Sequence, residues 1–353
     1  MGLQDFTVSL LSPMVLAFIL GIIATLVKSD LKFPEELYIA LTIYLLVAIG
    51  LKGGYKLSIS SVSEFWKPSI AAVVICVLIP IWSYWILHKW GKFDVPNAAA
   101  IAAHYGSVSA VTFAEAVAFH DNLKAAFLEQ NPTLTESALA AMGATYEGFM
   151  PSLLTIMEVP GILVALFIAR TSQMSLVTAS GGQLYEEENA KVGAVLCELL
   201  SGKSSLLLIG CLIIGVLAGK RGWEQVAPLF DTPFRGVLTL FLLEAGLVTG
   251  RRLADLKKVG GFLIGFGIIM PVLHAVLGIV LGKLAGLSMG GATILGVLSA
   301  SASYIAAPAA VRVALPEASP TYFLTASLAV TFPFNIIIGL PLYHFIAKTI
   351  YGA

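Results

Sequence analysis

The hydrophobic pattern of this chain consists of long apolar stretches that are separated by short polar segments. A helix that crosses a bilayer needs about 20 mostly apolar residues, and ten stretches are of this kind. They lie at residues 10–27, 35–51, 68–90, 96–119, 138–169, 204–219, 233–249, 259–284, 290–315 and 320–347. The pattern therefore predicts an all-α integral membrane protein with ten transmembrane helices.

Proline residues interrupt two of the longer stretches. The fifth contains Pro151 and Pro160, and the tenth contains Pro333 and Pro341. Proline removes a backbone donor and clashes with the preceding turn, so we expect these two helices to be tilted or kinked.

A small-residue pattern occurs twice, at equivalent places in stretches four and nine. Residues 98–119 and 292–313 are both apolar, and each contains a Ser-x-Ser pair among Gly and Ala residues. Interrupted hydrophobic segments at matching positions of two halves indicate the binding site of a secondary transporter. We therefore expect broken helices at spans four and nine. The predicted substrate-binding residues are Gly106, Ser107, Val108, Ser109, Ala300, Ser301, Ala302 and Ser303.

The most polar internal segment, residues 171–203, divides the chain into two halves of five spans each. An odd number of spans forces the second half to start from the opposite side, which gives an inverted repeat. A second match, between Leu45–Leu51 and Leu242–Leu247, supports the duplication. The predicted organisation is a first repeat over 1–170, a cytoplasmic linker over 171–203 and a second repeat over 204–353.

Composition excludes several classes of function. The chain is 58% hydrophobic and only 12% charged, whereas a soluble domain carries roughly 25% charged residues. The net charge is zero, so a nucleic-acid partner is not expected. The sequence contains no HExxH, G-x-S-x-G or P-loop motif, which argues against an enzyme and against ATP-driven transport. An ion gradient is the remaining source of energy, and no cofactor other than Na⁺ is expected.

The distribution of Lys and Arg among the short loops predicts the orientation. The side that contains the central segment collects more of these residues than the opposite side. By the positive-inside rule, the central segment is cytoplasmic and both termini lie outside the plasma (inner) membrane.

The repeated Ser-x-Ser segments suit the chemistry of both an anion and a cation. Half-helix N-termini present partial positive charge to an anion, and freed carbonyls with serine hydroxyls suit sodium. The alternative is that the small residues only pack helices closely; their duplication favours the binding site.

Two polar residues beside prolines extend the predicted sodium site. Glu158 precedes Pro160 in span five, and an ionisable group inside a membrane span indicates function because burying its charge is costly. Asn335 has a comparable place in span ten. The alternatives are a neutral or hydrogen-bonded carboxyl at Glu158 and a packing amide at Asn335. The predicted sodium ligands are Ser107, Ser109, Glu158, Ser301, Ser303 and Asn335, and no other metal is expected.

Glu115 and Arg312 follow the two Ser-x-Ser segments. They could pair with each other or gate the site. The preferred interpretation is that each reaches a helix end and extends its charge to the membrane surface.

Four segments resemble the sodium-dependent bicarbonate transporter family of the cyanobacterial SbtA type. They are Gly106–Ser109, Met157–Pro160, Ala300–Ser303 with Pro308, and Leu229–Gly236, which is similar to the "DPLFRG" segment of that family. The resemblance covers nearly the whole chain. It implies ten spans in two inverted halves, a homotrimer, sodium-coupled bicarbonate uptake between the two broken helices, and regulation by a small PII-like protein.

The chain departs from the cyanobacterial pattern in two places. Tyr304 stands where those members carry an acidic residue, so this part of the ion site is expected to differ. The central segment is shorter than theirs, which argues against a PII-like regulator.

Sodium-coupled symport of bicarbonate is therefore the predicted function. One alternative is a symporter or channel for another small monovalent anion, such as nitrite, formate or acetate. A symporter could also use protons as the coupling ion in place of sodium. A further alternative is an intramembrane sensor. A site walled by Ala, Gly and Ser suits such anions better than a di- or tricarboxylate.

Overall fold

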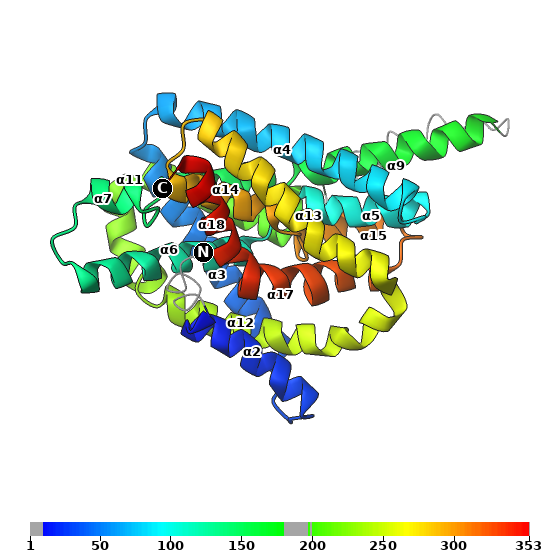
Figure 1. Cartoon of the computed structure of the whole chain (residues 1–353), viewed down its shortest axis with the longest axis horizontal. Coiled ribbons are helices and arrows are strands. Elements are labelled where there is room, and N and C mark those ends of the chain that lie inside the picture. Colours follow the sequence, from blue (N-terminus) through cyan, green and yellow to red (C-terminus); the bar gives the residue numbers. More distant parts are fainter. Residues whose placement is uncertain (1–9, 180–196, 198–199, 353) are drawn as a thin grey trace.

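The computed structural model describes residues 10–179, 197 and 200–352, and most of these residues are helical (Figure 1). Helix accounts for 83% of the described residues, and this part of the chain contains no β-strand. The predicted all-α class is confirmed.

The helices of the first half are α2 (Pro13–Leu26), α3 (Glu35–Ser58), α4 (Val62–Lys89), α5 (Val95–Gly106), α6 (Ala110–Gln130), α7 (Glu136–Ala141), α8 (Met150–Met157) and α9 (Pro160–Ala179). Those of the second half are α11 (Lys203–Phe230), α12 (Phe234–Arg252), the 3-10 helix η1 (Leu253–Asp255), α13 (Leu256–Leu284), α14 (Met289–Ala300), α15 (Ala306–Ala314) and the continuous series α16 (Pro320–Leu324), η2 (Thr325–Thr331), α17 (Phe332–Phe334), η3 (Asn335–Gly339) and α18 (Leu340–Tyr351).

Six helical segments among the described residues are long and apolar enough to cross a membrane. They include seven of the predicted spans, because α12 and α13 form one such segment over Phe234–Leu284. The first predicted span is the shorter helix α2, and the fourth and ninth are the interrupted pairs α5–α6 and α14–α15. The chain is therefore a multi-pass membrane protein.

The fifth predicted span is wrong at its start. Residues 143–149 are mostly non-helical, beginning at Gly143, whose φ of 71° ends α7. The membrane helix starts only at Met150, and the expected kink lies between α8 and α9, directly before Pro160. Helix α9 then continues to Ala179, so the first part of the predicted linker is helical; residues 180–196 and 198–199 of that linker lie outside the described residues.

The tenth span accommodates Pro333 without a break. The helix is π-helical on both sides of this proline, in η2 and η3. A wider helical turn relocates the backbone hydrogen bond that proline cannot donate.

Helix ends gather at two opposite faces of the molecule (Figure 1). One, called here the C-terminal face, includes α7, the start of α14 and the end of α18, where the Tyr351 hydroxyl donates to the Leu287 carbonyl at 2.7 Å. The other, called the central-segment face, includes the end of α9 and the start of α5. There the Ser319 amide donates to the Asn97 side-chain oxygen at 2.8 Å.

Four helices, α2, α3, α11 and α12, pack on one another and are called here the panel. Two glycine pairs bring their backbones into contact. A Cβ atom on Gly21 of α2 would lie 2.9 Å from the Cα of Gly246 on α12, and one on Gly54 of α3 would lie 2.9 Å from the Cα of Gly215 on α11. The remaining helices, α4 to α9 and α13 to α18, are called the bundle, and the candidate site lies between the bundle and the panel.

Candidate ion and anion site

Two half-helices enter the bundle from opposite faces and end inside it. Helix α5 starts at the central-segment face and ends at Gly106, and α14 starts at the C-terminal face and ends at Ala300. Each has 12 residues, so each is about 18 Å long, which is roughly half of a membrane span. Beyond each break the chain continues as α6 from Ala110 and as α15 from Ala306.

The two breaks bind each other through hydrogen bonds. The backbone amide of Ser303 donates to the His104 carbonyl at 2.7 Å, and the amide of Ser109 donates to the Ser301 hydroxyl at 3.0 Å. The Ser301 hydroxyl in turn donates to the Leu298 carbonyl at 2.7 Å. The Ser-x-Ser segments of the two halves are thus adjacent in space.

Replacing Ser301 by alanine is expected to destabilise this crossing. The substitution leaves the buried Ser109 amide without an acceptor, at a cost of about 1–3 kcal/mol. Ser299→Ala is a matched control, because the Ser299 hydroxyl only donates to the Leu295 carbonyl of its own helix. We expect Ser301→Ala to lower the thermal unfolding temperature in detergent more than Ser299→Ala does; equal temperatures would contradict this account.

Ser107 and Asn335 also fix the crossing through backbone carbonyls. The Ser107 hydroxyl donates to the Glu158 carbonyl at 2.7 Å. The Asn335 amide donates to the Ala300 carbonyl at 2.9 Å, and its oxygen accepts from the Tyr343 hydroxyl at 2.7 Å. Both breaks are therefore held by the proline-containing helices next to them.

A small cavity, called here the central cavity, lies beside the breaks. Its lining residues are Leu46, Val108, Ser109, Ala110, Glu158, Ser204, Ser303, Tyr304 and Ile305. Its volume is about 10 Å³, which is close to the space that one water molecule needs. A sodium ion fits a space of this size, whereas a bicarbonate ion is too large for it.

Two oxygen atoms of the lining residues have no hydrogen-bond partner. The Glu158 carboxyl accepts a bond from the Ser204 hydroxyl at 2.9 Å through one oxygen, and its other oxygen, Oε2, is buried and unpartnered. The Tyr304 hydroxyl is also buried without a hydrogen-bond partner. The Tyr304 ring packs edge-on against Phe332. Buried polar atoms are normally satisfied, so these two oxygens require an explanation such as an ion.

Helix ends around the cavity present both signs of partial charge. Helices α6 and α15 begin at the breaks, so the partial positive charge of their first turns favours an anion, whereas α5 and α14 end at the same breaks with partial negative charge, which favours a cation. Ser109 and Ser303 partly cap the beginning helices, through the Thr112 amide at 3.2 Å and the Ala307 amide at 3.3 Å. The helix ends therefore provide partial charges of the sign that suits each of the two ions.

Only part of the predicted sodium set lines the central cavity. Ser109, Glu158 and Ser303 line it, whereas the side chains of Ser107, Ser301 and Asn335 hold the backbone of the crossing. Of the predicted substrate residues, Val108, Ser109 and Ser303 contribute to the lining, and Gly106, Ala300 and Ala302 are buried in the crossing itself.

The predicted site residues did not include Leu46 and Ser204, which belong to the panel, or Ala110 and Ile305 of the bundle, and Tyr304 was considered only through the family resemblance. For Ser204, the available signal was the polar pair Ser204-Ser205 at the start of an apolar span.

The preferred interpretation of Glu115 is wrong. Glu115 does not reach the membrane surface: it is buried in α6, and its Oε2 atom has no hydrogen-bond partner. The predicted fourth span ends at residue 119, but α6 continues to Gln130, so Glu115 lies within the helix and not at its end. Arg312, in contrast, is exposed near the end of α15.

Comparison with protein families identifies a match over most of the chain. The family model described as the Na⁺-dependent bicarbonate transporter superfamily matches residues 13–348, which is most of the chain. No curated protein matches the chain.

Proposed function

The chain belongs to the Na⁺-dependent bicarbonate transporter superfamily, and we propose that it carries out sodium-coupled uptake (symport) of bicarbonate across the plasma (inner) membrane. The observation that carries this proposal is the central cavity, where two unpartnered oxygens and two helix N-termini meet. The homotrimer that the family resemblance implies stays a prediction.

Sodium and bicarbonate would use different atoms of this site. The carboxylate of Glu158, the hydroxyls of Ser109, Ser303 and Tyr304, and the carbonyls at the ends of α5 and α14 are oxygen donors that suit sodium. The free amides at the starts of α6 and α15 suit the oxygens of bicarbonate. A bound sodium ion would also compensate the charge of the anion, which couples the binding of the two ions.

A movement between panel and bundle would open the site to bicarbonate. The panel supplies only Leu46 and Ser204 to the lining, and all other lining residues belong to the bundle. Separation of the two groups therefore enlarges the central cavity without disrupting the crossing. Such a movement around a fixed site is the general mechanism of inverted-repeat transporters.

The contacts of the panel support an inverted repeat. Gly21 and Gly215 are separated by 194 residues, which equals the separation of Ser107 from Ser301. The partners of these glycines, Gly246 and Gly54, are separated by 192 residues. The contact between α2 and α12 is thus repeated, with the halves exchanged, as the contact between α11 and α3.

Three cavities follow one another along the border of panel and bundle. The central cavity shares Ser204 and Ile305 with an inner cavity of about 220 Å³ at the start of α11. An outer cavity of about 290 Å³ lies toward the C-terminal face. Because the middle space is only about 10 Å³, the described residues leave no wide pore, which favours a carrier over an anion channel.

Reconstitution in liposomes tests the function. We expect purified protein to accumulate radiolabelled bicarbonate when an inward sodium gradient is present and not when potassium replaces sodium. Accumulation under a proton gradient alone would show proton coupling. Sodium-independent, electrodiffusive flux would show a channel, and binding without flux would show a sensor; each of these results contradicts the proposal.

A further inference from the structure

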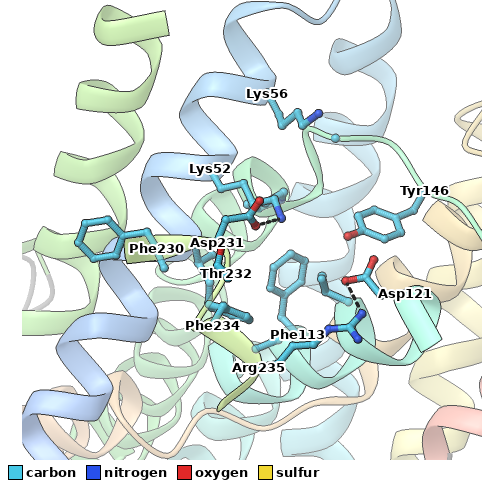
Figure 2. Close-up of a pocket in the computed structure, with 16 residues that line it drawn as sticks. Lys52, Lys56, Phe113, Asp121, Tyr146, Phe230, Asp231, Thr232, Phe234 and Arg235 are labelled. Carbon is cyan, nitrogen blue, oxygen red and sulfur yellow. Dashed lines mark hydrogen bonds and ion pairs between the residues drawn. The ribbon is translucent and has the colours of Figure 1, made fainter. Parts of the chain in front are cut away.

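The outer cavity lies between panel and bundle, and several cationic side chains line it (Figure 2). Its volume is about 290 Å³, enough for a small anion together with several water molecules. The panel contributes Lys52 and Lys56 from α3 and Asp231 and Arg235 from the junction of α11 and α12. The bundle contributes Phe113 and Asp121 from α6 and Tyr146 from the segment before α8.

Two ion pairs account for four of the five charged groups in this lining. Lys52 Nζ lies 2.7 Å from Asp231 Oδ1, and Arg235 Nη2 lies 3.2 Å from Asp121 Oδ2 (Figure 2). Lys56 has no carboxylate within 4.0 Å among the described residues, and its ammonium lies 5.3 Å from the centre of the neighbouring Tyr55 ring. The lining therefore carries one positive charge that no carboxylate balances.

The position of the outer cavity connects it to the central one. On α3, Leu46 lines the central cavity, and Ala48, Ile49, Lys52 and Lys56 line the outer one. At the start of α6, the N-cap residue Ser109 and Ala110 line the central cavity, and further along this helix Phe113, Val117 and Asp121 line the outer one. The two spaces thus follow each other along the same pair of helices, with Ile49 and Phe113 at the side of the outer cavity that faces the central one.

We propose that the outer cavity is a second binding site, where a small monovalent oxyanion, the transported substrate, binds before it reaches the central cavity. This inference rests on the proposed function. One unbalanced positive charge matches one monovalent anion, and a charged recess with low-dielectric walls raises the local concentration of its counter-ion. The Tyr146 hydroxyl can donate a hydrogen bond to an oxygen atom of the bound anion, so we expect the site to prefer an oxyanion over chloride.

The ion pair between Arg235 and Asp121 joins the panel to the bundle across this site. Lys52 and Asp231 both belong to the panel, but Asp121 belongs to α6 of the bundle. Lys56 and Arg235 line the same cavity, so an anion inside it is attracted by the Arg235 guanidinium, the partner of Asp121, as well as by the Lys56 ammonium. Occupation of the outer site therefore weakens a contact that must break when panel and bundle separate.

Protection of an introduced cysteine measures binding without transport. Thr232 is exposed and lines the outer cavity, so Thr232→Cys is expected to react with the uncharged reagent N-ethylmaleimide. In sodium-free buffer at constant pH, bicarbonate is expected to cause a saturable loss of labelling rate. Chloride should protect less, and the chain without this substitution corrects for Cys76, Cys197 and Cys211. The proposal would be overturned if bicarbonate does not protect Thr232→Cys, or if chloride protects it equally well. It would also be overturned if bicarbonate protects the cysteine equally well when Lys56→Gln is present in the same chain.

Uptake kinetics give an independent test. We expect Lys56→Gln to raise the apparent KM for bicarbonate about tenfold, the lower end of electrostatic concentration effects, with little change in maximal rate. Lys56→Arg keeps the charge and should keep the KM. Lys67→Gln is the matched control, since Lys67 is an exposed lysine at the start of α4, at the same face but outside the cavity.

The outcomes separate the two proposals. The outer site would be overturned if the original protein shows sodium-driven uptake and the Lys56→Gln variant, eluting as one species, has the same KM. That result would leave the transporter function intact. Cysteine protection by bicarbonate without any uptake would support the outer site and overturn the symport.

Discussion

Replacing Glu158 by glutamine is expected to abolish sodium-driven uptake of bicarbonate. Glutamine has nearly the same shape and can still accept the Ser204 hydrogen bond, but it provides no negative charge to the central cavity. Removing one partner of a buried charge pair typically costs about 3–5 kcal/mol, and every 1.4 kcal/mol is about a tenfold change in affinity. We therefore expect the sodium affinity to fall at least about a hundredfold, measured as the sodium concentration for half-maximal uptake.

Two variants serve as controls for the Glu158 prediction. Ser204→Ala removes the hydrogen bond to the carboxyl but keeps its charge, so we expect a much smaller loss of sodium affinity. Glu244→Gln neutralises another buried carboxyl, on α12, that lines none of the three cavities. Glu158→Gln protein with unchanged sodium dependence, or an equally large loss in Glu244→Gln, would show that the central cavity is not the sodium site.

Replacing Gly161 by alanine is expected to have the largest effect on stability. A methyl group on Gly161 would overlap the Gly106 carbonyl at the end of α5. The overlapped atoms belong to the Gly106 backbone, so no side chain can rotate away and the helices α5 and α9 must move apart. Such overpacking costs about 1–3 kcal/mol or more. The displacement also separates Ser107 from the Glu158 carbonyl. We expect a lower thermal unfolding temperature in detergent and strongly reduced uptake.

Gly210→Ala is the matched control for Gly161→Ala. Gly210 lies inside α11, and no atom lies within 4 Å of a Cβ atom built on it. Alanine favours the helix over glycine by about 1 kcal/mol, so this variant should unfold at the same temperature as the original protein or higher. If both variants unfold alike, the contact between Gly106 and Gly161 does not determine the stability of the crossing.

The broken helices could be predicted from the sequence because their signal is local and occurs twice. Gly106–Ser109 and Ala300–Ser303 are small-residue interruptions within apolar stretches, and both fall at the helix breaks. The kink at Pro160 was predictable for the same reason, since proline acts on its own helix. These features depend on residues that are neighbours in the chain.

Features that depend on distant residues were not predicted. Lys52 and Asp231 form an ion pair across 179 residues of sequence, and Ser204 approaches Glu158 only because the panel packs on the bundle. The segment that contains Asp231 and Arg235 was noticed for its resemblance to a family motif, which gave these residues no role. The start of the fifth span was missed because residues 138–149 have an apolar composition but follow the turn at Gly143.

The glycine contacts of the panel restrict how the protein can deform. Where Gly21 meets Gly246 and Gly54 meets Gly215, backbone touches backbone and no side chain can change rotamer to absorb a shear between the helices. We therefore expect the panel to move as a rigid body. Any large displacement must occur along its border, where single side-chain contacts such as Arg235 with Asp121 and Ser204 with Glu158 can break and form again.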